Sequence, residues 1–316
     1  MTQFFENLPE LKEQPLWITI GNFDGLHRGH QALLARLMQN AARDGEKSAM
    51  ITFQPHPRVV LQNIQGPFYL ACEAEKQVLL AESGLDYVFT LTFDRKLAEL
   101  NAAQFLSLLL KHLDLRGLTV SENFALGKDR TGTLRELGKQ CARHAFTLDI
   151  VPPFCLHGKP VSSGRVREAL ETGDVRGAAD LLGHPYFVRS KVVEGKHLGS
   201  KLGFPTANQV VNPQKILPKY GVYATRASFN GEKLMGVTSV GVRPTFETTT
   251  QANIETLLLD FDDNIYHENL TVEFIEYLRP EIKYESVQDL IDQIEQDKRE
   301  ARRILTHESC PENLSA

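Results

Sequence analysis

The chain of 316 residues lacks the features that identify a secreted, disulfide-bonded or membrane-spanning protein. It has only four cysteines, and no two of them have the C-x-x-C spacing of a zinc or redox site. No run of 18 apolar residues occurs, and residues 1–15 lack the basic start and apolar stretch of a signal peptide. We therefore expect reduced thiols and a cytoplasmic protein.

An excess of positive charge is also absent. Acidic residues outnumber basic ones by 40 to 35, so the net charge is -5 at pH 7. Proteins that coat nucleic acid or an anionic membrane usually carry a strong positive excess. We therefore expect small-molecule partners, with neither nucleic acid nor a membrane among them. The sequence G-x-x-x-x-G-K-[ST] does not occur either, which excludes a conventional P-loop.

Apolar residues are plentiful, at 42% of the chain, and the length suggests two domains of ordinary size. In the first half, short apolar runs alternate with segments of helical periodicity. The expected strands cover residues 16–20, 49–53, 87–93, 118–120 and 146–151, and the expected helices cover residues 31–43, 73–83, 102–112 and 133–144. This alternation predicts a Rossmann-like α/β domain with a parallel sheet covered on both faces, whose ligands gather at the carboxyl ends of the strands.

The second half has a periodicity near two. Alternating runs flank Asn230-Gly231, a dipeptide typical of hairpin turns, and further runs flank residues 262–264. An amphipathic helix is expected over residues 286–305, with four apolar side chains on one face: Val287, Leu290, Ile291 and Ile294. We predict a β-barrel domain followed by a C-terminal helix.

The expected boundary between the two domains lies within residues 173–185, where the composition changes. The resulting division is residues 1–182, residues 183–306 and a tail of residues 307–316.

The most unusual stretch is ITIGNFDGLHRGHQALLARL, residues 18–37, where a strand passes into a helix. His27 and His30 lie at the start of this helix, where backbone N–H groups and the helix dipole favour anions. Imidazole N–H groups at this place can donate hydrogen bonds to phosphate oxygens, and the glycines allow a ligand to approach the backbone. The alternative is that these residues only form a turn and cap the helix. The residues by themselves do not decide between the two interpretations.

Several motifs, in the same order along the chain, resemble a known family. GNFDGLHRGH (residues 21–30) is similar to the signature of nucleotidyltransferases with a His-x-Gly-His motif. TFQPHP (residues 52–57) and VSSGRVREAL (residues 161–170) lie where the bacterial bifunctional riboflavin kinase/FMN adenylyltransferases, or FAD synthetases, have matching motifs. The riboflavin kinase module is resembled by GSKLGFPTAN (residues 199–208), LPKYGVYA (217–224), VGVRPTF (240–246), IETLLLDF (254–261) and residues 272–297. The resemblance extends from about residue 16 to residue 305.

For the first domain, the resemblance implies transfer of the adenylyl group of ATP to FMN, giving FAD and pyrophosphate. His27 and His30 are then catalytic donors to the triphosphate. The implied nucleotide-binding residues are Gly21, Asn22, Phe23, Gly25, Gly29, Ser162, Ser163 and Arg167, with Arg165 assisting. Taken without the family, the motif around Ser163 is better interpreted as a helix start with that serine as N-cap.

The implied flavin-binding residues of the first domain are Asp24, His56 and Asn123. For His56, which lies between two prolines, the alternative is an ordinary surface imidazole on a rigid loop.

For the second domain, the resemblance implies phosphorylation of riboflavin to FMN with ATP and Mg²⁺. Thr206 and Asn208 are the implied metal and nucleotide ligands, because hydroxyl and amide oxygens suit Mg²⁺ bound to phosphates. Lys201 and Gly203 complete the nucleotide set, Glu255 is the implied general base and Arg279 faces the flavin. On periodicity alone, Glu255 is a solvent-facing strand residue and Arg279 a surface charge.

The chain departs from the family pattern at six positions: Tyr69, Ala71, Ser121, Asn123, Gly164 and Leu257. The acid usually found at Asn123 and the hydroxyl usually found at Gly164 are lost, so we expect an active but slower adenylyl transfer. The alternatives are a flavin-binding regulatory protein, or a riboflavin kinase with a weakened adenylyltransferase half. The retained catalytic residues favour the enzyme, because a binding protein needs neither a base nor phosphate-gripping imidazoles.

Overall fold

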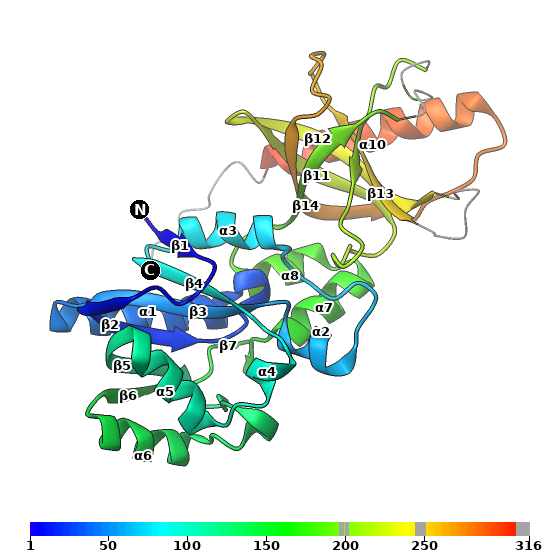
Figure 1. Ribbon diagram of the computed structural model, residues 1–316. Coiled ribbons are helices and arrows are strands. Elements are labelled where there is room, and N and C mark those ends of the chain that lie inside the picture. Colours follow the sequence, from blue (N-terminus) through cyan, green and yellow to red (C-terminus); the bar gives the residue numbers. More distant parts are fainter. Residues whose placement is uncertain (196–198, 200–201, 244–250, 308–316) are drawn as a thin grey trace. The chain divides into compact units, whose positions relative to one another are not determined.

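The computed structural model describes residues 1–195, 199, 202–243 and 251–307. The chain divides into two compact units, Met1–Ser163 and Gly164–Ala316, each with its own hydrophobic core. Figure 1 labels the elements of both units. No helix in the described ranges is long and apolar enough to cross a membrane.

The first unit alternates strands and helices. Its elements are β1 (Gln3–Phe5), β2 (Leu11–Ile20), η1 (Asp24–Leu26), α1 (Arg28–Asp44), β3 (Lys47–Gln54), α2 (Pro57–Gln62), α3 (Glu73–Ala81), β4 (Tyr87–Thr92), α4 (Arg95–Ala98), α5 (Ala102–His112), β5 (Leu113–Ser121), η2 (Lys128–Arg130), α6 (Leu134–His144), β6 (Thr147–Val151), β7 (Cys155–Leu156) and β8 (Lys159–Pro160), followed by the first residue of α7.

Six of these strands form one sheet in the order β1-β4-β3-β2-β5-β6, and all neighbouring pairs are parallel. The predicted parallel sheet is therefore confirmed. The strand order reverses at β2, which lies between β3 and β5, so a crevice for ligands is expected at the carboxyl end of β2. The loop that follows β2 carries the two histidines.

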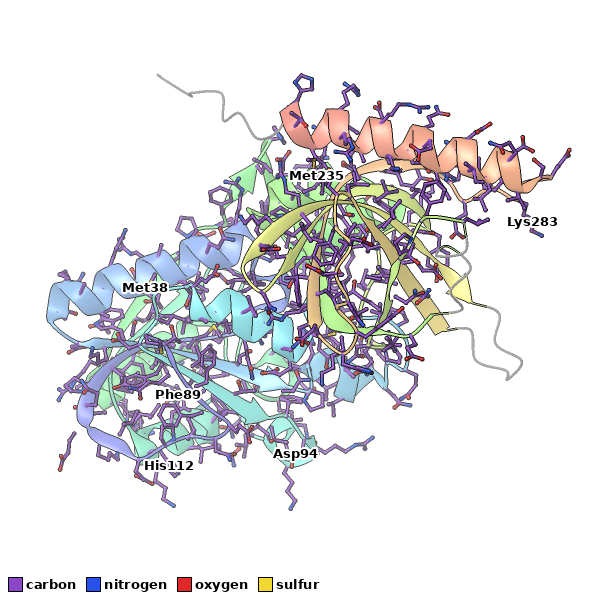
Figure 2. All side chains as sticks on the ribbon, turned by 90° about the horizontal axis from the view of Figure 1, so that it is seen from above. Met38, Phe89, Asp94, His112, Met235 and Lys283 are labelled. Carbon is purple, nitrogen blue, oxygen red and sulfur yellow. The ribbon has the colours of Figure 1, made fainter. Side chains whose placement is uncertain are left out.

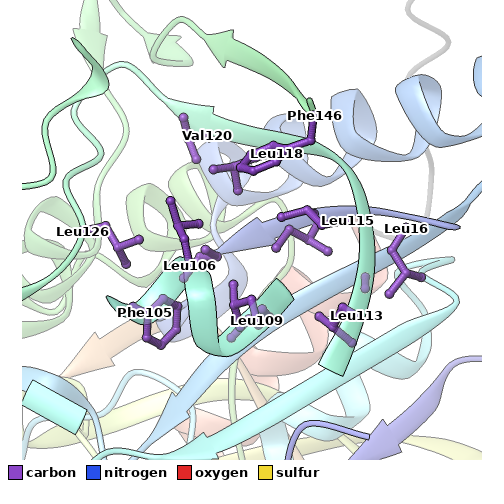
Figure 3. Close-up of a cluster of buried hydrophobic side chains, with 14 of the residues drawn as sticks. Leu16, Phe105, Leu106, Leu109, Leu113, Leu115, Leu118, Val120, Leu126 and Phe146 are labelled. Carbon is purple, nitrogen blue, oxygen red and sulfur yellow. The ribbon is translucent and has the colours of Figure 1, made fainter. Parts of the chain in front are cut away.

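Residues of β2 are buried on both faces of the sheet. Leu16 and Ile18 pack towards α5 and α6, in the cluster that Figure 3 shows, whereas Trp17 packs towards α1 and α3. A Cβ atom at Gly117 would lie 2.2 Å from the Trp17 ring, so only glycine fits beside this tryptophan. The two cores hold β2 rigidly, and with it the loop at its end.

The second unit contains a barrel between helices. Its elements are α7 (Ser163–Thr172), α8 (Val175–Leu182), β9 (Tyr186–Val193), β10 (Ala207–Val210), β11 (Gly221–Phe229), β12 (Glu232–Arg243), β13 (Gln251–Leu258), β14 (Asn269–Arg279) and α10 (Val287–His307). The closed barrel has the order β10-β13-β12-β11-β14-β9, and its neighbouring strands are antiparallel. The predicted barrel with a terminal helix is confirmed.

The predicted hairpin turn joins β11 to β12. Asn230 and Gly231 both have positive φ, 47° and 85°, as a tight two-residue hairpin turn requires. The apolar face of α10 lies against the barrel. Figure 2 labels Lys283 just ahead of this helix. Val287, which was expected on this apolar face, is 59% exposed at the beginning of α10.

Both α7 and α8 belong to the barrel unit. The apolar side chains of α8, including Val175 and Leu182, are buried, and the helix contacts β9 and β14. The backbone carbonyl of Leu170 in α7 accepts a hydrogen bond of 2.8 Å from the Lys219 N–H. The compact units thus divide at residue 163, whereas the division of activities at residue 182 remains a prediction.

Candidate active sites

The loop after β2 turns sharply before α1 begins. Phe23, Gly25 and Leu26 have left-handed backbone conformations, with φ of 50°, 77° and 42°. Phe23 is 1% exposed, and its ring centroid lies 5.1 Å from that of His30. A Cβ atom at Gly21 would approach the Phe23 ring to 3.0 Å. Gly21 and Phe23 therefore shape the loop from inside.

The two histidines stack on each other. Their ring centroids are 3.6 Å apart, at an angle of 11° between the ring planes. His27 is the N-cap of α1, and its Nδ1 accepts a hydrogen bond of 3.3 Å from the His30 backbone N–H. The capping interpretation is therefore correct as geometry. It leaves the other ring nitrogen of His27 as the donor, because a neutral imidazole has one donor and one acceptor.

Gly29 makes room for this arrangement. A Cβ atom at Gly29 would lie 3.1 Å from Cε1 and 3.2 Å from Nδ1 of His27, and 3.6 Å from the Val161 carbonyl oxygen. The glycine between the histidines thus permits both the stacked rings and the nearby segment that leads into α7.

His30 is neutral at neutral pH. Burial, followed by the charges of His27 and Lys76, holds the pKa of His30 well below its usual range. Its Nδ1 atom is buried and has no hydrogen-bond partner. The pair therefore contains a buried polar atom that the protein itself leaves unsatisfied.

Lys76 is a residue that the sequence analysis missed. It lies on α3, is 7% exposed, and its Nζ donates to the Asn22 carbonyl at 2.8 Å and to the Thr52 hydroxyl at 2.6 Å. Burial lowers the pKa of Lys76 to about 8, against the opposing effect of Glu73 and Asp24. A signal did exist in the sequence, since Lys76 lies one helical turn before the buried Leu80 on the same face.

Asp24 fastens a neighbouring loop. Its Oδ1 accepts hydrogen bonds from the backbone N–H groups of Leu70 at 2.9 Å and Ala71 at 3.2 Å. The Tyr69 hydroxyl accepts a hydrogen bond of 3.0 Å from the His56 N–H. Tyr69 and Ala71, two of the departures from the family pattern, thus belong to a well-anchored loop.

His56 is not a surface residue, so that alternative is wrong. It is 8% exposed and is the N-cap of α2, where its Nδ1 accepts from the Arg58 N–H at 3.0 Å. Its ring meets the edge of Phe68, with centroids 4.7 Å apart. Asn123, by contrast, is exposed, and its backbone carbonyl accepts a hydrogen bond of 3.0 Å from Arg130.

A hydrogen bond from Ser163 links the motif of residues 161–170 to the histidine motif of residues 21–30. The Ser163 hydroxyl donates a hydrogen bond of 3.2 Å to the Asp24 carbonyl oxygen. Ser163 is already the first residue of α7, so the helix start is confirmed, whereas its interpretation as the N-cap is wrong. Ser162 precedes the helix and is exposed, and Arg165 and Arg167 lie within it as half-buried side chains.

A cavity of about 570 Å³, lined by barrel strands, by the segment before α10 and by α10 itself, unites three of the predicted residues, Thr206, Glu255 and Arg279. Its walls are largely apolar. Further lining residues are Gly199, Phe204, Val222, Val237, Ser239, Leu257, Glu281, Ile282, Lys283, Tyr284, Leu290, Ile294 and Asp297. Leu257, one of the departures from the family pattern, is therefore part of the cavity wall. Glu255 faces this cavity, so the interpretation as an ordinary solvent-facing residue is wrong.

Asn208 and Glu255 are direct neighbours across the pair β10 and β13. Asn253 donates a hydrogen bond of 2.8 Å to Glu255 Oε1, and Asn208 Nδ2 donates one of 3.2 Å to the Thr206 carbonyl. Asn208 thus lies beside Glu255 and Thr206, the two of these residues that line the cavity. Gly203 has a positive φ of 84° in the preceding loop. Lys201 lies outside the described residues.

Arg279 is held at the cavity by a buried ion pair. Its Nε and Nη2 donate to the Asp297 carboxylate of α10, at 2.9 Å and 2.7 Å, and the two side chains are 17% and 5% exposed. The interpretation of Arg279 as a surface charge is therefore wrong. Its guanidinium carbon also lies 6.0 Å from the centre of the Tyr284 ring.

A second cavity, of about 250 Å³, shares Thr206 with the first. Its other walls include Pro205, Phe261 and Tyr266. Thr206 consequently lies between two hollows, of which the larger contains the carboxylate of Glu255. No group of three or more histidine, cysteine, aspartate or glutamate side chains able to hold a metal occurs among residues 1–195, 199, 202–243 and 251–307.

These two units define a class of protein. A parallel sheet with two imidazoles at its switch point suits an enzyme that acts on phosphate-bearing ligands, and the second unit adds a cavity lined by the Glu255 carboxylate and the Thr206 hydroxyl.

Comparison with known proteins identifies the family. The family model described as FAD synthetase matches residues 10–165, and the one described as riboflavin kinase matches residues 182–305. The chain is 35% identical to the bifunctional riboflavin kinase/FMN adenylyltransferase of Listeria monocytogenes, over 90% of this chain and 91% of that protein. It is 37% identical to the Escherichia coli protein of the same name, over 94% and 95%. The chain belongs to the family of bifunctional riboflavin kinase/FMN adenylyltransferases.

A solved structure agrees with this fold. The crystal structure described as a macrolide-efflux protein from Streptococcus pneumoniae is 28% identical and covers 95% of this chain and 98% of that one, with a TM-score of 0.84. The likeness thus extends over both units.

Proposed function

We propose that this chain phosphorylates riboflavin with ATP to give FMN and ADP, and then adenylylates FMN with a second ATP to give FAD and pyrophosphate. The observation that carries the proposal is the barrel cavity in which Thr206, Glu255 and Arg279 meet, in a chain that also has the stacked histidines. The partners are the small molecules riboflavin, FMN and ATP. We assign adenylyl transfer to residues 1–182 and the kinase reaction to residues 183–306, and a cytoplasmic location remains our prediction.

In the kinase reaction, riboflavin occupies the larger cavity with its flat ring system between the apolar walls. Glu255 accepts the proton of the 5′-hydroxyl while that oxygen attacks the γ-phosphorus, and ADP leaves. Arg279, which Asp297 holds in place, donates hydrogen bonds to the ring system. ATP lies in the smaller cavity, so that its phosphates reach Thr206, which lines both hollows.

The residues around Thr206 suit Mg²⁺. The Thr206 hydroxyl and the Asn208 amide are neutral oxygen donors next to the Glu255 carboxylate, a set that fits a hard cation carried mainly by phosphates. When bound, the ion neutralises charge on the phosphates of ATP. Thr206 and Asn208 hold it, and Glu255 keeps its role as base.

In adenylyl transfer, an oxygen of the FMN phosphate attacks the α-phosphorus of ATP, and the bond to pyrophosphate breaks. His27 and His30 donate hydrogen bonds to the phosphate oxygens as negative charge develops on them, at the start of α1. Ser162, Ser163 and Arg167 hold the departing β- and γ-phosphates, since arginine offers a planar fork of donors. Asp24, His56 and Asn123 belong to the flavin side of this site.

A flavin-binding protein without activity is not favoured. The departures at Asn123 and Gly164 were its only support, and the chain matches both enzyme modules of the family.

The experiment is direct. Purified protein is incubated with riboflavin and MgATP, and the flavins, ADP and pyrophosphate are separated over time. We expect FMN first and FAD afterwards. Formation of FMN without FAD would support the kinase activity alone. Binding of riboflavin without any product would overturn the enzyme function.

A further inference from the structure

Lys76 is a buried cation at the carboxyl ends of two central strands. Its Nζ bonds to the carbonyl of Asn22, which follows β2, and to the hydroxyl of Thr52 in β3. The Thr52 hydroxyl itself donates to the Asn22 carbonyl, at 3.2 Å. The ammonium group therefore lies at the edge of the sheet where ligands of parallel folds bind, beside the loop of the histidines.

The hydrogen bonds of Lys76 are incomplete. An ammonium group has three N–H donors, whereas two acceptors are present and both are neutral. Within the described part of the chain, no carboxylate lies within ion-pair distance of Nζ. Asp24 is the nearest acidic residue of the histidine loop, but its Oδ1 is already engaged by the N–H groups of Leu70 and Ala71.

A buried charge without an opposite charge is costly to the folded protein. If Lys76 served only to hold the loop and the strand together, a neutral donor could make the same hydrogen bonds to Asn22 and Thr52. His30, close enough for the two charges to disfavour each other, also has an unsatisfied buried nitrogen. Two neighbouring groups are thus left for an anion to satisfy.

We propose that Lys76 supplies the fixed positive charge of the adenylyl-transfer site and that the phosphates of the bound nucleotide are its counter-ion. The inference rests on the assignment of adenylyl transfer to the first unit. Lysine suits the role because its ammonium is a compact point charge. It stabilises the charge that develops on the phosphate oxygens as pyrophosphate leaves, and the histidines act beside it as neutral donors.

The test uses the full-length protein with three variants. Lys76→Met removes the charge and keeps the length of the side chain, and Lys76→Arg keeps a charge. Thr52→Val is the matched control, because it removes a hydrogen bond from the same ammonium and leaves its charge in place. FAD formation is measured from FMN and MgATP, and riboflavin phosphorylation is measured separately. The fluorescence of Trp17, the only tryptophan of the chain, reports whether the first unit is folded.

We expect Lys76→Met to lower kcat/KM for FAD formation by roughly 10²-fold, with riboflavin phosphorylation unchanged. In Thr52→Val, kcat/KM for FAD formation should fall by less than about tenfold, because the ammonium loses one hydrogen bond but keeps its charge. Equal losses in these two variants, or less than about threefold loss in Lys76→Met, would overturn the proposal. Absence of FAD formation in the unaltered protein would instead contradict the proposed function.

A pH profile keeps the proposal testable if Lys76→Met does not fold. The charged and titratable groups that face Lys76 are Glu73 on its own helix, Asp24 on η1 and His30 on α1, and His27, the N-cap of α1, lies against His30. With the pKa of Lys76 lowered to about 8, kcat/KM of the unaltered protein should fall as pH rises through that value. The nearby Tyr69 still titrates in Lys76→Arg, but the arginine does not. We expect the alkaline loss to disappear in that variant, and its persistence, or its absence from the unaltered protein, refutes the role of Lys76.

Discussion

At the scale of single residues, the geometry of His27 combines an observed helix cap with the phosphate-binding role that we propose for it. One ring nitrogen, Nδ1, caps α1 by accepting from the His30 N–H, and the ring stacks on that of His30. Capping and phosphate binding are therefore not alternatives. The residue pattern could not decide between them because both require a polar side chain at the same helix position.

Replacement of either histidine by alanine should lower FAD formation by roughly 10²-fold, the usual effect of losing one preorganised donor to developing charge. Phosphorylation of riboflavin should continue, because its residues lie in the barrel, so FMN accumulates. FMN and FAD are measured separately for His27→Ala and His30→Ala. Normal FAD formation together with a lowered melting temperature would mean that the two histidines only cap α1 and do not bind phosphate.

The buried His30 also makes the first unit sensitive to acid. Its pKa is lowered in the folded protein, so below about pH 6.5 the unfolded chain binds more protons and stability falls as pH falls. The melting temperature reported by Trp17 should drop more between pH 7.5 and 5.5 in the unaltered protein than in His30→Gln. Equal drops would mean that His30 is not the group responsible.

Glu255 is tested by Glu255→Gln, which keeps the hydrogen bond from Asn253 and removes the base. FMN formation should fall by about 10²-fold or more, whereas riboflavin binding and FAD formation from added FMN persist. Glu273→Gln on β14, away from the cavity, is the control and should be neutral. A comparable loss in both variants points to a disturbed barrel.

At the scale of elements, the sequence predicted what apolar periodicity determines. The core strands and α5 agree with the structure because most of their buried side chains are apolar. The edge strand β1 and the beginning of β2 were missed, since β1 has three residues and Pro15 interrupts β2. The short helices α2 and α4 were missed as well, because six and four residues do not establish a helical period.

The sequence predicted part of each candidate site, as it predicted part of the fold. Glu255 and Arg279 were found by resemblance, whereas their neighbours depend on strand pairing and on packing that no motif records. The pairing of Asn208 with Glu255 and the ion pair of Arg279 with Asp297 join positions far apart in the chain. Lys76 was missed for the same reason, since its partners lie in β3 and the loop after β2.

The helix α10 positions Arg279 through Asp297, and Gln293 donates a further hydrogen bond of 3.0 Å to that carboxylate. Asp297→Asn leaves a buried arginine without its counter-ion, which should destabilise the barrel by about 3 kcal/mol and raise KM for riboflavin more than it lowers kcat. Asp292→Asn, on the exposed side of the same helix, is the control. Thermal unfolding and kinase kinetics are measured on both, and an unchanged KM in a folded Asp297→Asn protein would contradict the positioning role.

At the scale of the whole molecule, the compact units and the modules of the family divide the chain at different residues. The riboflavin kinase match begins at residue 182, whereas α7 and α8 pack with the barrel from residue 164. The difference concerns α7 and α8, and α8 has a buried apolar face and contacts β9 and β14. The proposed kinase residues lie in the barrel unit, and a helix that lies almost entirely outside the matched module packs against the barrel.

Two fragments test this division, one of residues 163–316 and one of residues 183–316. Both contain Thr206, Glu255 and Arg279, so both should convert riboflavin to FMN where they fold. The longer fragment keeps α8, and burial of a large apolar side chain contributes about 1.5–3 kcal/mol. Its melting temperature should therefore be higher by roughly 5 °C or more. Equal melting temperatures would mean that α8 adds nothing to the barrel. A folded longer fragment that binds riboflavin without phosphorylating it would show that the kinase needs residues of the first unit.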